Sequence, residues 1–317
     1  MQQRTLDAGT GTKVSRFCLG AMPFGTTVDE KTAFAVLDRF VEAGGTTIDT
    51  ANCYSFWVPG GTGGESETVL GRWLKDRGNR DTLTLASKVG SGPGPDGAAE
   101  GLGAEVIRTE LEGSLRRLGT DHLDLYYAHR EDRNTPDEET LAAFHRTVTD
   151  GKVRVLGASN HTAWRLAETR SLAEARGWTP YTAVQQRYSY LRPRPNTVLP
   201  EGGHVHASDE LLDYVGSRGL TLFAYTSLLF GIYGRSDKPL PEHYAHPGTD
   251  RRLRALAKVS AELGVTPIQA VLAWLTGGEP AVVPIIGVSS VAQLDECLAA
   301  ADLELPEELR KELDEAA

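Results

Sequence analysis

The chain has 317 residues, of which 40% are hydrophobic and 24% are charged, and its formal net charge at pH 7 is −10. This size suits one large globular domain or two ordinary ones, and the acidic balance without a Lys/Arg run argues against a nucleic-acid partner. An N-terminus without an apolar signal segment, and the lack of any apolar run of about 18 residues, predict a cytoplasmic protein with no membrane partner.

Eight short β-branched or apolar segments follow one another along the chain and predict β-strands. Their ranges are 14–19, 46–50, 82–88, 123–129, 153–158, 181–187, 220–226 and 281–286. Each is short, and each is separated from the next by sequence with a different periodicity. The pattern therefore predicts strands that alternate with helices.

The intervening segments place apolar residues at helical spacing. The predicted helices cover about 30–43, 65–77, 104–118, 137–150, 162–176, 208–218, 250–263, 266–276 and 290–300. Asp29 is the expected N-cap of the first, and Gly44 the expected stop signal after it. Thr266-Pro267 is a capping residue followed by a proline in the first turn of its helix.

Eight β–α alternations without a change in composition predict a single (β/α)8 barrel domain over residues 1–317, with extended loops at its C-terminal face. A doubly wound open sheet is the competing fold. Its glycine-rich turn is missing after the first strand, where the sequence is Gly20-Ala21-Met22-Pro23-Phe24-Gly25. A GxGxxG string at 92–97 contains two prolines and precedes no immediate helix, so we interpret it as a loop.

Four ionisable side chains stand at or just after the ends of three predicted strands, where a barrel carries its active site. They are Asp49, Tyr54, Lys88 and His129. Tyr54 is the expected proton donor, with its pKa lowered by the Lys88 ammonium and Lys88 held in place by Asp49. A neutral His129 would orient a carbonyl oxygen. The alternative is two surface residues, Tyr54 and Lys88, and a hydrogen-bonded core histidine.

Several stretches resemble the signature of the aldo-keto reductases, in order from about residue 4 to about residue 305. They are residues 49–54, 64–67, 87–88, 123–129 and 151–160, with Gln185 before Tyr188. This resemblance implies an NAD(P)H-dependent barrel in which Asp49, Tyr54, Lys88 and His129 form the catalytic tetrad. The implied partner is a small-molecule carbonyl substrate, and the oligomeric state stays open.

The same resemblance implies the residues that hold the nicotinamide end of the cofactor. Ser159, Asn160 and Gln185 would bond its carboxamide, because amide and hydroxyl groups supply donors and acceptors. Tyr225 would stack on the ring, and the loop Thr226-Ser227-Leu228 would lie against the pyrophosphate. Alternatively, Ser159 and Asn160 cap the following helix and Tyr225 is a core residue.

The segment expected at the adenosine end departs from the family pattern. Its cofactor-binding candidates are Gly287, Ser289, Gln293, Glu296 and Cys297. Residues 287–297 contain no Lys or Arg for a 2′-phosphate, and Cys297 stands where Asn is usual in the family. The resemblance favours NADPH, while this segment keeps NADH open. Arg235 or an arginine from 251–254 is an alternative phosphate partner.

The loop between Tyr54 and Gly64 is longer than the short link common in the family. It places Phe56 and Trp57 beside the proton donor, and with Met22 these residues predict an apolar wall for a bulky or aromatic substrate. Alternatively, the two aromatic residues only anchor the loop. The long stretch 192–208 is a second segment that could fold over the pocket.

The pairs His204-His206 and His243-His246 lie in Gly- and Pro-rich sequence without Cys or carboxylate partners at ligand spacing. We interpret them as loop residues and predict no metal. Three widely spaced Cys residues likewise predict neither a disulfide framework nor a zinc motif. Two other functions stay open: a cofactor-sensing or scaffolding barrel similar to channel β-subunits, and a Schiff-base enzyme that uses Lys88.

Overall fold

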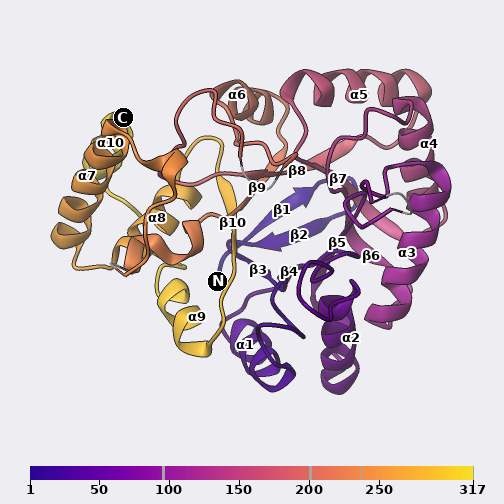
Figure 1. The fold of residues 1–317 in the computed structure, drawn as a ribbon, viewed down its shortest axis with the longest axis horizontal. Helices are drawn as coiled ribbons and strands as arrows, with labels where there is room; N and C mark the ends of the chain where they lie inside the picture. Colours follow the sequence, from indigo (N-terminus) through magenta and orange to yellow (C-terminus); the bar gives the residue numbers. More distant parts are fainter. Residues whose placement is uncertain (95–96, 200–201, 236, 317) are drawn as a thin grey trace.

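The computed structural model describes residues 1–94, 97–199, 202–235 and 237–316. Eight parallel strands close into a barrel in the order β10-β3-β4-β5-β6-β7-β8-β9, and helices surround it (Figure 1). The predicted (β/α)8 fold is therefore confirmed.

The barrel strands are short, as the sequence predicted. They are β3 (Cys18–Gly20), β4 (Thr47–Asp49), β5 (Thr84–Val89), β6 (Leu123–Ala128), β7 (Val153–Ser159), β8 (Tyr181–Arg187), β9 (Thr221–Tyr225) and β10 (Val282–Ile286). The register pairs Gly20 with Asp49, Asp49 with Ala86 and Lys88 with Tyr127. Parallel pairing brings the C-terminal strand ends to one face of the barrel.

The predicted first strand, 14–19, is wrong as a single element. Val14 and Ser15 belong to β2 (Thr12–Ser15), which pairs antiparallel with β1 (Gln3–Asp7), and the barrel strand starts only at Cys18. The hairpin lies over the N-terminal end of the barrel, where Thr84 Oγ1 donates to the carbonyl of Lys13 over 2.6 Å. The chain bends at Arg16 and Phe17, where no Gly, Pro, Asn or Asp marks a turn in the sequence.

The helices match the predicted segments closely. They are α1 (Glu30–Glu42), α2 (Glu65–Arg77), α3 (Ala104–Leu118), α4 (Asp137–Thr149), α5 (Ala163–Arg176), α6 (Asp209–Ser217), α7 (Pro247–Leu263), α8 (Pro267–Thr276) and α9 (Val291–Leu298). A further helix, α10 (Glu307–Glu315), was not predicted. The Asp29 side chain accepts from Thr32 N, and Thr266 forms a capping box with Gln269, which confirms both caps.

Two layers of apolar side chains hold the barrel together. One fills its interior, including Leu125, Tyr127 and Phe223, and the other lies between the strands and the helices. Within the described ranges no single helix is long and apolar enough to cross a membrane; α7 and α8 pass that test only as a pair bent by 97°.

The loop interpretation of 92–97 holds for the part that the structure covers. Gly97 N donates to the carbonyl of Gly94, and no helix starts before Ala104. Pro95 and Asp96 of this string lie outside the described residues, as do Pro200 and Glu201 of the stretch 192–208.

Helices α2 and α3 pack tightly against each other at Gly71. A Cβ placed there would lie 2.1 Å from the carbonyl oxygen of Arg117, a backbone atom that cannot rotate away. We expect Gly71→Ala to lower the free energy of unfolding by about 2 kcal/mol, because overpacking outweighs the better helix propensity of Ala. Urea denaturation would measure it. Gly78→Ala is not a clean control because Gly78 has a positive φ. Arg108→Ala on the exposed face of α3 removes only a surface ion pair with Glu105 and should leave the free energy of unfolding nearly unchanged.

Candidate active site

Three of the four predicted catalytic side chains meet inside one rim of the barrel. The fully buried Lys88 Nζ lies 2.6 Å from Asp49 Oδ2, 2.6 Å from the carbonyl oxygen of Thr50 and 2.7 Å from Tyr54 Oη. An ammonium has three hydrogens to donate, and these contacts use all of them. Lys88 is thus fixed between a carboxylate and a phenol.

The phenol of Tyr54 is more basic than the sequence predicted. Burial, and next the charge of Asp49, raise the pKa of Tyr54 well above its ordinary value of 10.0. The expectation that the pKa of Tyr54 is lowered is wrong, because removal from water disfavours the phenolate. Tyr54 therefore keeps its proton at neutral pH.

His129 follows β6 directly and lies beside Tyr54, with ring centroids 5.9 Å apart. Burial, and next the charge of Lys88, lower the pKa of His129 well below its ordinary value of 6.5. Its imidazole is therefore neutral at pH 7, as expected from the sequence. The Nδ1 atom lies 3.9 Å from Cys53 Sγ, and burial raises the pKa of that thiol to about 12.

The residues expected at the nicotinamide also gather at this rim. Gln185 Nε2 donates to Asp49 Oδ1 over 2.9 Å, which joins it directly to the Lys88 cluster. Asn160 Oδ1 accepts from Tyr225 Oη over 2.6 Å, and Asn160 Nδ2 donates to Ser159 Oγ over 3.0 Å. Tyr225 itself is half-buried. The set supplies amide, hydroxyl and aromatic groups along one side of the barrel mouth.

Unusual backbone conformations mark the same end of the barrel. Among the described residues, six other than glycine have positive φ: Ser55, Asn160, Asn196, Thr226, Leu229 and Phe230. Thr226 is β-branched, for which a φ of 52° is strained. Such strain concentrates at binding and catalytic sites. Here it lies beside Tyr54, at the end of β7 and in the loop after β9.

In that loop, Ser227 is buried and its hydroxyl donates to the carbonyl of Ile285, while Leu228 is half-buried. In the segment after β10, Gly287 and Ser289 are exposed, and Ser289 N donates to Gln293 Oε1 over 2.8 Å. Glu296 is half-buried. Cys297 is buried against the core, so its thiol does not face an open surface.

The three substrate-wall candidates are all partly open to solvent. Met22 is 45% exposed, Phe56 38% and Trp57 53%. Trp57 meets Tyr54 edge to face at 6.2 Å between centroids, and Phe56 meets Trp57 at 5.1 Å. The two aromatic residues form a continuous apolar surface next to the phenol.

The histidine pairs lie in different surroundings. His204 contacts the ring of Tyr225 at 5.3 Å, and Val205 N donates to Asn160 Oδ1, so this part of the 192–208 stretch reaches the barrel mouth. Burial lowers the pKa of His206 to about 4. His246 Nε2 lies 2.9 Å from the carbonyl oxygen of Arg192. Across the described ranges no three His, Cys, Asp or Glu side chains form a group that could hold a metal.

Sequence reasoning missed two supporting networks. Asn52 Nδ2 donates to both Glu100 and Glu110, which ties the loop before Tyr54 to the loop after β5 and to α3. The fully buried Glu67 accepts from Ser87 Oγ and from Arg117 Nε, each over 2.6 Å. Glu67 lies in the stretch 64–67. A carboxylate on the apolar face of the predicted helix could have indicated that it is buried and paired.

Comparison with known proteins gives a consistent result. A family model described as the aldo/keto reductase family matches residues 16–317. An uncharacterized oxidoreductase, YrpG, of Bacillus subtilis is 33% identical, with 96% of this chain and 93% of the relative covered. The norsolorinic acid reductase stcV of Emericella nidulans is 33% identical over 96% of this chain and 79% of its own length. The aldo-keto reductase ausK of Aspergillus calidoustus is 30% identical, with 98% and 81% covered.

Proposed function

Because the chain belongs to the aldo/keto reductase family, we propose that it reduces an aldehyde or ketone to the alcohol with a nicotinamide cofactor. The observation that carries this proposal is the contact of Lys88 Nζ with both Asp49 and Tyr54 at the barrel mouth. This contact supports a phenol that is held at a fixed position. The apolar surface of Phe56 and Trp57 lies next to that phenol.

The residues at the mouth fit the cofactor. Bound NAD(P)H would supply hydride to the carbonyl carbon. Ser159, Asn160 and Gln185 would hold its carboxamide. Among the described contacts the Ser159 hydroxyl accepts from Asn160 but donates to no protein acceptor, so its hydrogen is available. Tyr225 offers a half-buried aromatic face.

In the proposed mechanism Tyr54 donates its proton to the carbonyl oxygen. Its raised pKa keeps the proton on the phenol until negative charge develops on that oxygen. Lys88 then stabilises the phenolate through the hydrogen bond that it already donates to Tyr54 Oη. Lys88 itself is a poor Schiff-base nucleophile, because its three donors are engaged and it is fully buried.

His129 is proposed to orient the carbonyl. The thiol of Cys53 keeps its hydrogen, since its pKa is raised to about 12, and it can donate to His129 Nδ1. This contact favours the tautomer with hydrogen on Nε2. That hydrogen is then free to bond the substrate oxygen, and a neutral imidazole does not compete with Tyr54 as the acid.

The pKa directions predict a broad pH profile for reduction. Activity needs Tyr54 protonated and His129 neutral, so kcat/KM should stay level from below 6.5 to above 10.0, the ordinary values of the two groups. It should fall only as the pH rises through the raised pKa of Tyr54 or drops through the lowered pKa of His129. A descending limb well below pH 10.0, the ordinary pKa of Tyr, would instead mean that the charge of Lys88 outweighs burial and lowers the pKa of Tyr54.

The test of the function is a steady-state assay with NADPH and a panel of aldehydes, following the loss of NADPH absorbance. We expect turnover, with kcat/KM higher for aromatic than for short aliphatic aldehydes, because Phe56 and Trp57 offer an apolar wall. Two relatives are named norsolorinic acid reductases, which supports a reductase function. A cofactor sensor or scaffold would bind NADPH without appreciable turnover.

Trp57→Ala distinguishes two roles of Trp57, contact with the substrate and anchoring of the loop. If Trp57 contacts the substrate, KM for an aromatic aldehyde should rise about tenfold or more, the effect of losing roughly 1.4 kcal/mol of contact, with little change for acetaldehyde. Trp164→Ala is a matched control, since Trp164 is also 53% exposed and lies on α5. Equal effects on both aldehydes would indicate an anchoring role.

The cofactor preference is proposed to be NADPH on the family resemblance, with NADH competing better than usual. Residues 287–297 carry no cation, and Arg235 is ion-paired with Asp237 at 2.6 Å. Fluorescence titration with both cofactors is the direct measurement. A marked preference for NADPH would require a phosphate partner from outside that segment, such as an arginine of 251–254.

A further inference from the structure

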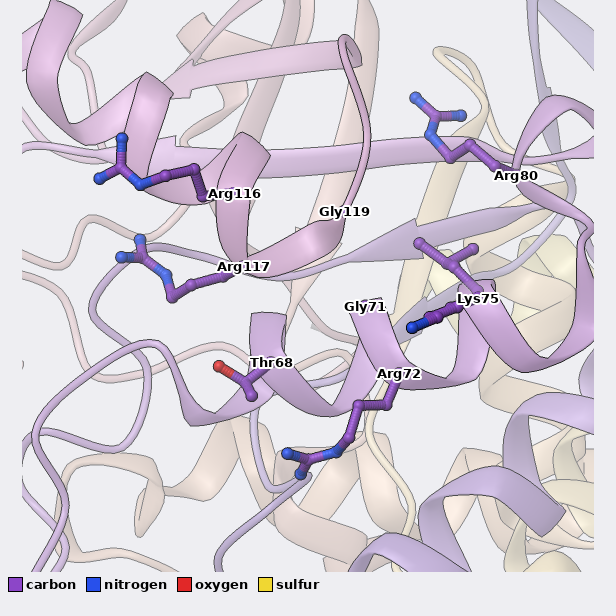
Figure 2. A pocket seen from close by; sticks show the side chains of 9 residues that line it. Thr68, Gly71, Arg72, Lys75, Arg80, Arg116, Arg117 and Gly119 are labelled. Atoms are coloured by element: carbon purple, nitrogen blue, oxygen red, sulfur yellow. The ribbon is translucent and has the colours of Figure 1, made fainter.

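A cavity of about 360 Å³ lies on the outside of the barrel, between α2 and α3. Thr68, Gly71, Arg72, Leu74 and Lys75 of α2, Arg116 and Arg117 of α3, and Arg80 and Gly119 beyond the helix ends line it (Figure 2). The proposed function uses none of these residues. The volume of the cavity is within the range of small-molecule sites.

The lining is strongly basic in a chain that is acidic overall. Five of the nine lining residues are Lys or Arg and none is Asp or Glu, although the chain carries 33 basic and 43 acidic residues. Arg117 and Arg80 are bonded to the buried Glu67 and Asp124, and Arg72 pairs with Glu30. In the described part of the chain neither Lys75 nor Arg116 has an ion-pair partner, so two cations remain for a ligand.

The two uncompensated cations lie toward the end of the barrel opposite its mouth. Lys75 is in the last turn of α2, Arg116 is in the last turn of α3, and Arg80 precedes β5. In a β/α barrel these positions lie toward the N-terminal ends of the strands, while Tyr54 and Lys88 lie at the C-terminal ends. Cations in a last helical turn also complement the helix dipole. That role accounts for their place in each helix, but it does not require them to line one cavity.

We propose that this cavity is a binding site for a small phosphate-bearing anion. Arg and Lys give charge-assisted hydrogen bonds to phosphate oxygens. Lys75 and Arg116 would supply the uncompensated charge, and Arg72 would add donors at the edge. Gly71 lets α2 and α3 lie close together along the cavity, because any side chain there would meet the backbone of Arg117.

The test is calorimetric titration of the full chain with inorganic pyrophosphate at low ionic strength, in the presence of saturating NADPH to fill the cofactor pocket. We expect a Kd of about 1 mM or tighter, which weakens as salt is added. The double variant Lys75→Gln/Arg116→Gln should weaken binding at least about tenfold. Both residues are exposed, so the variant should fold, which thermal melting verifies.

The matched control is Arg218→Gln/Lys311→Gln. It removes the same residue types and the same charge from the C-cap of α6 and from α10, on the other side of the molecule (Figure 1). Unchanged affinity in the control, with loss in the cavity variant, supports the site. No binding in the presence of saturating NADPH, or equal weakening in both variants, overturns it. The comparison between variants holds whether or not the protein proves to be a reductase.

Discussion

Replacing Tyr54 with Phe is expected to lower kcat for carbonyl reduction by about 10³-fold, the loss typical of a removed general acid. The Phe ring keeps the contacts with Trp57 and with Lys88 Nζ, which lies 4.6 Å from the ring centroid. NADPH affinity should therefore change little. Steady-state kinetics and fluorescence titration on the same preparation measure the two effects.

Tyr126→Phe is the matched control for this variant. Tyr126 is buried like Tyr54, but it faces α3, where its hydroxyl donates to the carbonyl of Ile107 over 3.3 Å. It should cost about 1 kcal/mol of stability and leave kcat unchanged. If Tyr54→Phe retained most of the turnover, the proton would come from another group, and the proposed mechanism would be wrong.

Replacing Lys88 with Met is expected to remove activity and also to lower the free energy of unfolding by about 3–5 kcal/mol, because it leaves the Asp49 carboxylate buried without its cation. Asp49 is 3% exposed, and its remaining side-chain partners are Gln185 and, at 3.5 Å, Tyr54 Oη. Urea denaturation and the aldehyde assay measure the two effects independently.

The double variant Asp49→Asn/Lys88→Met separates stability from catalysis. It removes the buried charge along with its partner, so much of the lost stability should return while activity stays absent. Recovery of both would mean that the single variant failed only through unfolding. Recovery of neither would mean that the packing of the Lys88 chain, rather than its charge, is what stabilises this part of the barrel.

The alternation of strands and helices was readable from the sequence because it depends on local periodicity. In runs such as 123–129 and in amphipathic segments such as α1, the spacing of apolar residues alone predicts which side chains are buried. The prediction of the first strand was wrong because it, too, relied only on local sequence. Residues 14–19 carry four apolar side chains and no Gly or Pro, but Val14 faces the barrel interior from the hairpin and Cys18 from the barrel wall, and no local pattern distinguishes these positions.

The candidate site was partly predictable. Counting strands placed Asp49, Lys88 and His129 at strand ends, and closure of the barrel joins them, as it joins Gln185 to Asp49 across 136 residues. The direction of the Tyr54 pKa was not predictable, since the adjacent Lys88 argues for a lower value. Burial decides against it, and burial is a property of the folded chain.

What the sequence determined by itself is therefore the order of the elements and the chemical groups that end them, because periodicity and residue type are local. What only the tertiary structure decided are quantities that arise between distant segments. These include the three donor contacts of Lys88, the support of Ser87 by Glu67 and Arg117, and the basic cavity between α2 and α3. Each depends on distance and exclusion of water, which exist only after the barrel has closed.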